Sequence, residues 1–240
     1  MAQGGVLRAA RVSWKAFCYA LGALAVAALA VQLWFYAQVL WLRGFQPATS
    51  AFMDRRLAEL RAGDPRARLA HQWAPYERIS SNLKRAVVAS EDAKFLDHEG
   101  FDWEAISKAI EKNERRGKVV AGASTISQQL AKNLFLSGER SWLRKGEEAA
   151  ITWMLESTLS KRRILELYLN FAEWGEGVFG AEAAARYHFG VPASALGASQ
   201  AAYLAAILPS PRRYARGTTT PYVAGRIETI LARMPGAQIP

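Results

Sequence analysis

Ten residues in the middle of the chain, Glu91 to Gly100, gather acidic, basic and aromatic side chains that together could move a proton. Leu83, Val87 and Glu91 recur at the four-residue spacing that puts side chains on one face of a helix. On a helix starting near Ser80, the Glu91 carboxylate would therefore point inward. Partial loss of water makes such a carboxylate a better proton acceptor, as a general base requires. The alternative is a solvated acidic pair at a helix end.

A second carboxylate, Glu148, follows the same logic. On a helix opened by Ser141, it shares one face with Ile151 and Leu155, so it should also point inward. Arg144 and Lys145 lie one turn earlier. The alternative is therefore a surface ion pair, which contributes only about 0.3–0.5 kcal/mol.

Between these carboxylates, residues 121–135 place a glycine and the hydroxyls of Ser124 and Thr125 before a helix. Backbone N–H groups at a helix start, with neighbouring hydroxyls, can receive phosphate or sugar oxygens. The alternative is an ordinary helix cap. A binding role is favoured by the amide and cationic side chains that follow, namely Gln128, Gln129, Lys132 and Asn133.

The elements that must position these groups are expected to be helices. Between Tyr76 and Val191 there is no proline, apolar residues keep helical spacing, and no strand pattern appears. The spacing predicts a mainly α-helical core with short loops. The expected helices are 51–62, 80–91, 103–116 capped by Asp102, a long helix from 141 that continues through 161–170, 181–189 and 199–208, with a mobile charged loop at 112–118.

The N-terminal part predicts a membrane anchor. Residues 16–42, 27 in all, contain no charged side chain, whereas a helix needs about 20 residues to cross the hydrocarbon layer. The run ends in aromatic residues rather than a cleavage site, so we expect it to be retained. Arg8, Arg11 and Lys15 precede it, which predicts a cytoplasmic N-terminus. The expected organisation is a cytoplasmic tail (1–15), a transmembrane helix (16–42), a juxtamembrane connector (43–74) and a catalytic domain (75–235) outside the inner membrane.

Charge and cysteine content narrow the class further. The net charge of +10 indicates an anionic partner, and a location outside the cell membrane excludes nucleic acid. Cys18 is the only cysteine, so no intramolecular disulfide can form and packing must hold the domain.

Five blocks of the sequence resemble the monofunctional biosynthetic peptidoglycan transglycosylases, which are related to the glycosyltransferase domain of bifunctional penicillin-binding proteins. They occur in the family's order and span most of the predicted soluble domain. The blocks are Glu91-Asp-x-x-Phe-x-x-His-x-Gly100, Gly122-x-Ser-Thr-Ile-Ser-Gln-Gln-Leu-x-Lys-Asn133, Arg144-Lys-x-x-Glu148, Lys161-x-x-Ile-Leu-Glu-x-Tyr-Leu-Asn170 and Leu204 to Pro211. Ser127 replaces the family's usual threonine and keeps the hydroxyl, while Tyr214 begins a loop without the family's usual Asn-Pro.

The resemblance implies a lysozyme-like domain in two lobes that polymerises lipid II into glycan strands. Glu91 would take the proton from the acceptor sugar's 4-hydroxyl, and Glu148 would lie on the side of the donor, the growing chain on undecaprenyl pyrophosphate. The two carboxyls would be about 6.5–9.5 Å apart, as in inverting glycosidases. The residues implied to bind substrate are Ser124, Thr125, Gln128, Gln129, Lys132, Asn133, Arg140, Arg144 and Lys145.

Two other readings of the same residues stay open. A lytic transglycosylase or muramidase would share the fold and one inward glutamate. Cleavage of a neutral glycosidic bond, however, does not need four cations beside the site, which here are Lys132, Arg140, Arg144 and Lys145. A non-catalytic scaffold of the division or elongation machinery would need neither carboxylate. No organic cofactor and no metal-ligand spacing is expected, and a divalent cation (Mg²⁺ or Mn²⁺) bridging the pyrophosphate stays an alternative. His98 is expected to brace the loop after Glu91, and residues 134–136, 142 and 143 to reach the membrane interface or the core.

Overall fold

The computed structural model describes residues 2–118, 122–136, 141–214 and 220–240. Most of the described chain is helical, which confirms the mainly α prediction. The elements in chain order are α1 (Ala2–Trp41), α2 (Ala51–Gly63), β1 (Ala70–His71), η1 (Tyr76–Arg78), α3 (Ser81–Glu91), α4 (Trp103–Arg116), α5 (Ile126–Phe135), α6 (Trp142–Thr158), α7 (Lys161–Phe171), β2 (Glu173–Gly175), β3 (Val178–Phe179), α8 (Ala181–Phe189), η2 (Ala193–Ala195), α9 (Ala198–Ile207), η3 (Pro211–Arg213), α10 (Pro221–Arg233) and η4 (Met234–Gly236).

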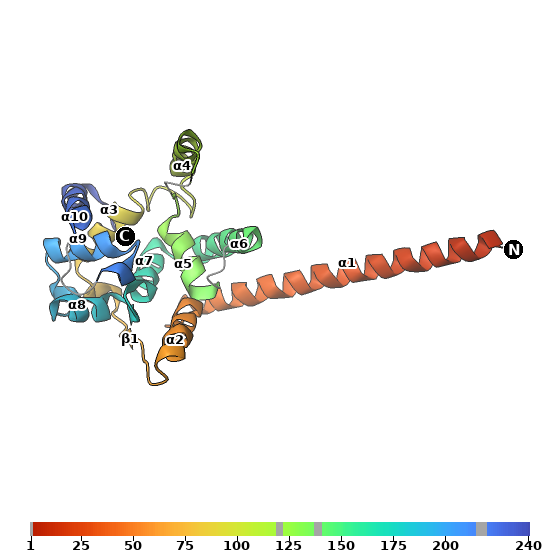
Figure 1. The fold of residues 1–240 in the computed structure, drawn as a ribbon, viewed down its shortest axis with the longest axis horizontal. Coiled ribbons are helices and arrows are strands. Elements are labelled where there is room, and N and C mark those ends of the chain that lie inside the picture. The colour runs from red at the N-terminus through yellow and green to blue at the C-terminus, as the bar shows by residue number, and fades with distance from the viewer. Residues whose placement is uncertain (1, 119–121, 137–140, 215–219) are drawn as a thin grey trace.

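Helix α1 projects from the folded body as a single long rod (Figure 1). Its segment Trp14–Trp41 is long and apolar enough to cross a membrane, by length and composition. The end of α1 meets the body, where Val39 is buried and Phe35 packs edge-to-face against Phe135 of α5, with ring centroids 5.9 Å apart. Helix α1 also contacts α6. The apolar rod is therefore attached to the part of the body built from α5 and α6.

The core is formed by helices that pack on their apolar faces. Helix α9 lies against both α3 and α10, and four of its five alanines, Ala201, Ala202, Ala205 and Ala206, are buried, so the helices pack closely here. Helix α5 lies against α6 and α7. Leu83 and Val87 of α3 are completely buried, as their spacing predicts. The end of α3 is thereby fixed against the core, and Glu91 is its last residue.

A small three-stranded sheet with order β1-β3-β2 is present, and its strands β2 and β3 lie in the segment 76–191, where no strand pattern appears in the sequence. Strand β3 pairs parallel with β1 and antiparallel with β2. Each strand has only two or three residues, which is too short for an alternating pattern to show. Gly180 follows β3 at φ +84°, and a Cβ there would lie 2.9 Å from the Asn170 carbonyl oxygen. A glycine is therefore required where the chain turns into α8.

Two predicted helix boundaries need correction. The long helix does not run through 161–170, because α6 ends before Leu159 and the Ser160 side chain caps a new helix, accepting a hydrogen bond from the Arg163 N–H. The expected charged loop at 112–118 is mostly helix, since α4 continues to Arg116. The Ser160 cap favours the start of a new helix over continuation of α6. In α4, Glu–Lys and Glu–Arg pairs spaced four residues apart stabilise the helix despite its charged sequence.

Helix α4 begins as predicted, with Asp102 accepting a hydrogen bond from the Ala105 N–H, and its end at Arg116 agrees with the predicted helix and not with the predicted loop. None of its residues is buried, and it stands apart from the other helices (Figure 1). Helix α2, in the segment 43–74, behaves differently: Met53 and Arg56 are buried and the helix packs against α5.

Candidate active site

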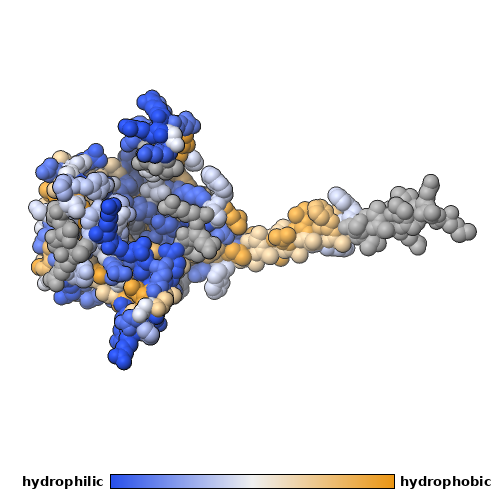
Figure 2. Space-filling view, viewed as in Figure 1, coloured by the Kyte–Doolittle hydropathy of each residue, from blue (hydrophilic) through white to orange (hydrophobic). Residues whose placement is uncertain are grey.

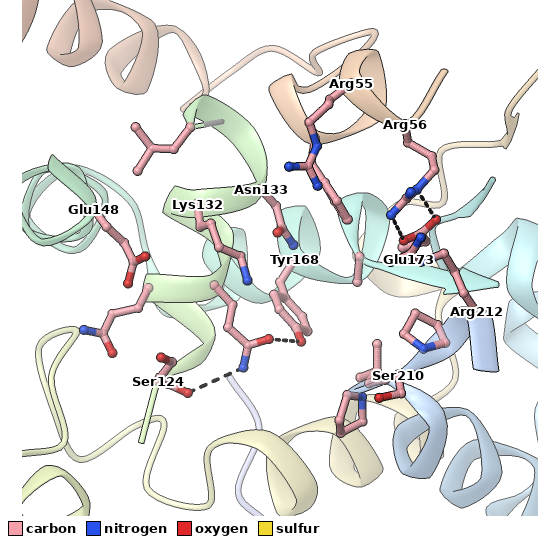
Figure 3. A pocket seen from close by; sticks show the side chains of 18 of the residues that line it. Arg55, Arg56, Ser124, Lys132, Asn133, Glu148, Tyr168, Glu173, Ser210 and Arg212 are labelled. Atoms are coloured by element: carbon pink, nitrogen blue, oxygen red, sulfur yellow. Dashed lines mark hydrogen bonds and ion pairs between the residues drawn. The ribbon is translucent and has the colours of Figure 1, made fainter. Parts of the chain in front are cut away.

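A cleft of about 810 Å³ lies between α2, α5, α6, α7 and the segment that follows α9 (Figure 3). Most of its lining is polar or charged. The lining residues are Phe52, Arg55, Arg56, Ser124, Gln128, Gln129, Lys132, Asn133, Leu136, Arg144, Lys145, Glu148, Tyr168, Ala172, Glu173 and 208–213.

Glu91 is connected to this cleft through Gln129. The Gln129 side-chain Nε2 donates to Glu91 Oε2 at 3.1 Å, and Ser90 Oγ donates to Glu91 Oε1 at 3.2 Å. The nearest cation among the described residues is Arg226 of α10, whose Nη2 lies 4.0 Å from Glu91 Oε1. The Glu91 side chain is 12% exposed. The prediction that it points inward is confirmed, and its hydrogen-bond donors are neutral groups.

Tyr168 of α7 fixes the orientation of the Gln129 amide. Its hydroxyl donates to Gln129 Oε1 at 2.9 Å, which turns Nε2 toward Glu91. Burial, followed by the nearby charges of Glu91 and Asp92, raises the pKa of Tyr168 well above its usual value of 10.0. The hydroxyl therefore stays a donor at any physiological pH. Sequence reasoning missed this role, because Tyr168 also fits the apolar face of its helix.

His98 braces the loop after Glu91, as predicted. The backbone N–H of Gly100 donates to His98 Nδ1 at 3.1 Å, so Nε2 carries the proton and faces Asp92 Oδ1 at 2.8 Å. The other Asp92 oxygen accepts from the Ile126 N–H of α5 at 3.0 Å. Asp92 thus ties the end of α3 to the start of α5, which sets Glu91 beside Gln129.

The start of α5 is an internally satisfied capping box rather than an open anion site. Thr125 Oγ1 accepts from the Gln128 N–H at 3.2 Å, Gln128 Oε1 accepts from the Thr125 N–H at 3.0 Å, and the Thr125 hydroxyl donates to the Gly100 carbonyl at 2.7 Å. Thr125 is buried and does not line the cleft. Thr125 therefore serves as the helix cap that the alternative describes, and its hydroxyl is already used within the protein.

Glu148 lines the cleft and is held by two cations. Arg144 Nη1 lies 2.8 Å from Glu148 Oε2, and Lys145 Nζ contacts Oε1. The Glu148 side chain is 4% exposed, so the predicted inward orientation is confirmed and the surface-pair alternative is wrong. The expected spacing between Glu91 and Glu148 stays a prediction.

The remaining predicted residues divide clearly. Arg140 lies outside the described residues. The predicted substrate contacts that line the cleft are Ser124, Gln128, Gln129, Lys132, Asn133, Arg144 and Lys145. Sequence reasoning missed five further charged lining residues, which are Arg55, Arg56, Glu173, Arg212 and Arg213.

Arg56 and Glu173 form a buried pair that closes one side of the cleft. Arg56 Nε lies 2.8 Å from Glu173 Oε1, and Nη2 lies 3.2 Å from Oε2. The two residues are 117 positions apart in the sequence, so no local pattern could pair them. The bidentate contact joins α2 to β2 and leaves Glu173 neutralised.

The apolar residues near the cleft separate into core and surface. Leu134 and Leu136 are buried, whereas Trp142 and Leu143 at the start of α6 are 93% and 79% exposed. Figure 2 shows the apolar surface of α1 continuing onto the part of the body that it meets.

Comparison with known proteins gives consistent matches. A family model described as Transglycosylase matches residues 54–235. The chain is 56% identical to the biosynthetic peptidoglycan transglycosylase of Janthinobacterium sp. (strain Marseille), over 88% of this chain and 92% of the relative. It is 55% identical to the protein of the same name from Azoarcus sp. (strain BH72), over 95% and 98% of the two chains. A further relative of that name, from Chromobacterium violaceum, is 54% identical over 92% of this chain and 96% of its own.

Proposed function

The chain belongs to the transglycosylase family, and from that premise we infer that it is a peptidoglycan glycosyltransferase, which polymerises glycan strands in cell-wall synthesis. Its mainly α-helical domain is lysozyme-like, as the resemblance implied. The long apolar helix α1 is consistent with membrane anchoring of an enzyme whose glycan substrate is lipid-linked.

In the proposed reaction, the acceptor is lipid II and the donor is the growing strand on undecaprenyl pyrophosphate. The acceptor's sugar 4-hydroxyl oxygen attacks the donor's anomeric carbon from the face opposite the pyrophosphate. A new glycosidic bond forms, the bond from the anomeric carbon to the pyrophosphate oxygen breaks with inversion, and the electron pair leaves with undecaprenyl pyrophosphate. The hydroxyl proton must go to a base.

We propose that Glu91 is this base. The observation that carries this proposal is the hydrogen bond from Gln129 to Glu91, because Gln129 also lines the cleft that holds Glu148 and its cations. Glu91 is mostly buried and its direct donors are neutral, so a proton can be accepted without breaking a close ion pair. Such a base contributes roughly 10²- to 10⁴-fold to the rate.

Glu148 and the neighbouring cations would serve the donor. Pyrophosphate is already a good leaving group, so electrostatic support matters more than a strong acid. Arg144 and Lys145 lie beside Glu148, and Lys132 lines the same cleft. We propose that these cations neutralise the pyrophosphate, together with Arg140 outside the described residues. The polar groups proposed to contact sugar and phosphate oxygens are Ser124, Gln128, Gln129 and Asn133.

A divalent cation remains a separate proposal. Within the described part of the chain, no group of three or more His, Cys, Asp and Glu side chains gathers to hold a metal ion. Mg²⁺ or Mn²⁺ would therefore arrive with the pyrophosphate oxygens. Chelation with EDTA, followed by Mg²⁺ or Mn²⁺ addition, tests it: activity that falls and is restored supports such a cation, and unchanged activity rejects it.

We also propose the arrangement at the membrane. The basic N-terminal tail would lie in the cytoplasm and the catalytic domain in the periplasm. Trp142 and Leu143, which are highly exposed on a helix that contacts α1, would enter the membrane interface. Anchoring would confine enzyme and lipid-linked substrates to one surface and raise their effective concentration. Division or elongation synthases are the proposed protein partners.

Polymerisation of purified lipid II by the full chain tests the assignment of Glu91. Glu91→Gln keeps the shape and the Gln129 contact but removes the base, so we expect the rate of strand formation to fall about 10²- to 10⁴-fold. Glu99→Gln, an exposed residue in the following loop, is the matched control and should retain activity. Normal strand formation by Glu91→Gln would remove the assignment. Hydrolysis of finished strands in place of synthesis would favour a lytic enzyme.

A further inference from the structure

Two arginines of the cleft have no part in the proposed chemistry. Arg212 and Arg213 lie on η3, directly after α9, and line the cleft with Ser210. Both are exposed, and within the described ranges neither side chain makes a hydrogen bond or an ion pair. Figure 3 shows Arg212 across the cleft from Glu148. Two cationic groups are thus available to a ligand at this end.

The backbone that carries these arginines is well held. The Ser210 N–H donates to the Ile207 carbonyl at 2.9 Å, and the Arg213 N–H donates to the Ser210 carbonyl at 3.0 Å. Pro211 restricts the first position of the turn, and Tyr214 is buried immediately after it. Strand β2 also packs against η3. The side chains of Arg212 and Arg213 therefore extend from a backbone segment whose conformation is fixed.

Charge in the cleft is strongly unbalanced. Among the residues that the structure describes, seven cationic side chains line it, against the two carboxylates of Glu148 and Glu173. Glu148 is already paired with Arg144 and Lys145, and Glu173 with Arg56. Neither carboxylate is left to neutralise Arg212 and Arg213. The cleft can therefore receive anionic groups at two places, of which the donor pyrophosphate would occupy only the Glu148 end.

We propose that Arg212 and Arg213 form an anion subsite for carboxylates on the peptide branches of the glycan, an inference that rests on the proposed function. A pyrophosphate is bonded to a membrane-embedded lipid, so it belongs near α6, which contacts α1. Helix α9, which leads into η3, lies on the side of the body away from α1 (Figure 1). Both pyrophosphates of the proposed reaction are attached to lipid, so the substrate anions that can extend to Arg212 and Arg213 are the carboxylates of the peptides. The guanidinium fork suits carboxylates, which it can bind through two parallel hydrogen bonds.

Steady-state polymerisation in neutral phosphatidylcholine vesicles tests the subsite. The probes are lipid II with its natural peptide and lipid II whose peptide carboxylates are converted to amides. For R212Q/R213Q we expect KM for the natural substrate to rise about two- to tenfold, the size expected of two solvent-accessible charge contacts. With amidated lipid II, KM should be the same for the variant and the unaltered chain. Arg233→Gln on α10, exposed and outside the cleft, is the matched control.

Three results would overturn the proposal. An equal KM for R212Q/R213Q and the unaltered chain means that the arginines bind nothing. A rise that persists with amidated lipid II assigns them to pyrophosphate instead. A defect that appears only when phosphatidylglycerol is added assigns them to lipid headgroups. Absence of strand synthesis by the unaltered chain and Arg233→Gln would reject the proposed function itself, and is distinct from all three.

Discussion

The surroundings of Glu91 and of Glu148 differ in how charge is distributed around each carboxylate. Glu91 accepts hydrogen bonds from a serine and an amide, and its nearest described cation, Arg226, is 4.0 Å away. Glu148 touches two cations, with Arg144 at 2.8 Å. A proton arriving at Glu148 would disrupt two close ion pairs, whereas one arriving at Glu91 would not. Glu91 is therefore suited to accept a proton. Glu148, Arg144 and Lys145 form a fixed group of charges suited to act on the pyrophosphate, and we call this group the clamp.

The largest expected effect at the clamp comes from Arg144→Gln. Loss of a preorganised cation at a developing charge costs about 10²- to 10³-fold in kcat. Because the group acts on the departing pyrophosphate, KM for the acceptor should change little. Rates measured at separately varied donor and acceptor concentrations check this. Equal losses in kcat and in acceptor binding would show that Arg144 stabilises the bound substrate as much as the transition state. The distinction between Glu91 and the clamp would then fail.

A smaller effect is expected on the Glu91 side from Tyr168→Phe, which removes the hydrogen bond that orients Gln129. A neutral hydrogen bond contributes about 0.5–1.5 kcal/mol, so kcat should fall roughly 2- to 10-fold with KM nearly unchanged. Because burial raises the pKa of Tyr168, its hydroxyl is protonated in the native enzyme from pH 6 to 10, and the ratio of the two rates should be constant over that range. A ratio that collapses toward one at high pH would contradict the orienting role.

The smallest effect is expected from Arg226→Gln. Its guanidinium donates to Ser90 Oγ at 3.0 Å but lies 4.0 Å from Glu91, and its side chain is 29% exposed. Partly exposed pairs contribute about 0.2–1 kcal/mol, which corresponds to less than about a fivefold change in kcat. Initial rates beside Arg233→Gln measure it. A loss of kcat as large as that of Arg144→Gln would show that Glu91, like Glu148, depends on a close cation.

Local signals in the sequence predicted the helices that carry the carboxylates. The apolar spacing of Leu83 and Val87 placed Glu91 inward at the end of α3, and Ser141 marked the start of α6. Side-chain caps and periodic apolar faces act over three or four residues, so they can be read without the fold. The predicted bracing role of His98 is also local, since its partners Asp92 and Gly100 are close in sequence.

Contacts between distant segments could not be predicted this way. Arg56 pairs with Glu173 only because α2 folds against α5 and the sheet, and Arg212 follows two prolines with no periodic pattern around it. Thr125 shows the opposite failure: a hydroxyl before a helix fits both a cap and a substrate contact, and only the capping-box geometry separates them. Side-chain type alone does not show whether a donor is already used.

Rescue by formate tests the distinction between the two carboxylates most directly. In Glu91→Ala, a small external carboxylate can enter the vacated space and accept the acceptor's proton. In Glu148→Ala, it cannot restore a clamp that acts on the pyrophosphate through Arg144 and Lys145. Strand formation from lipid II by Glu91→Ala should therefore rise with formate concentration, while that of Glu148→Ala should not. Rescue of Glu148→Ala without rescue of Glu91→Ala would contradict the account.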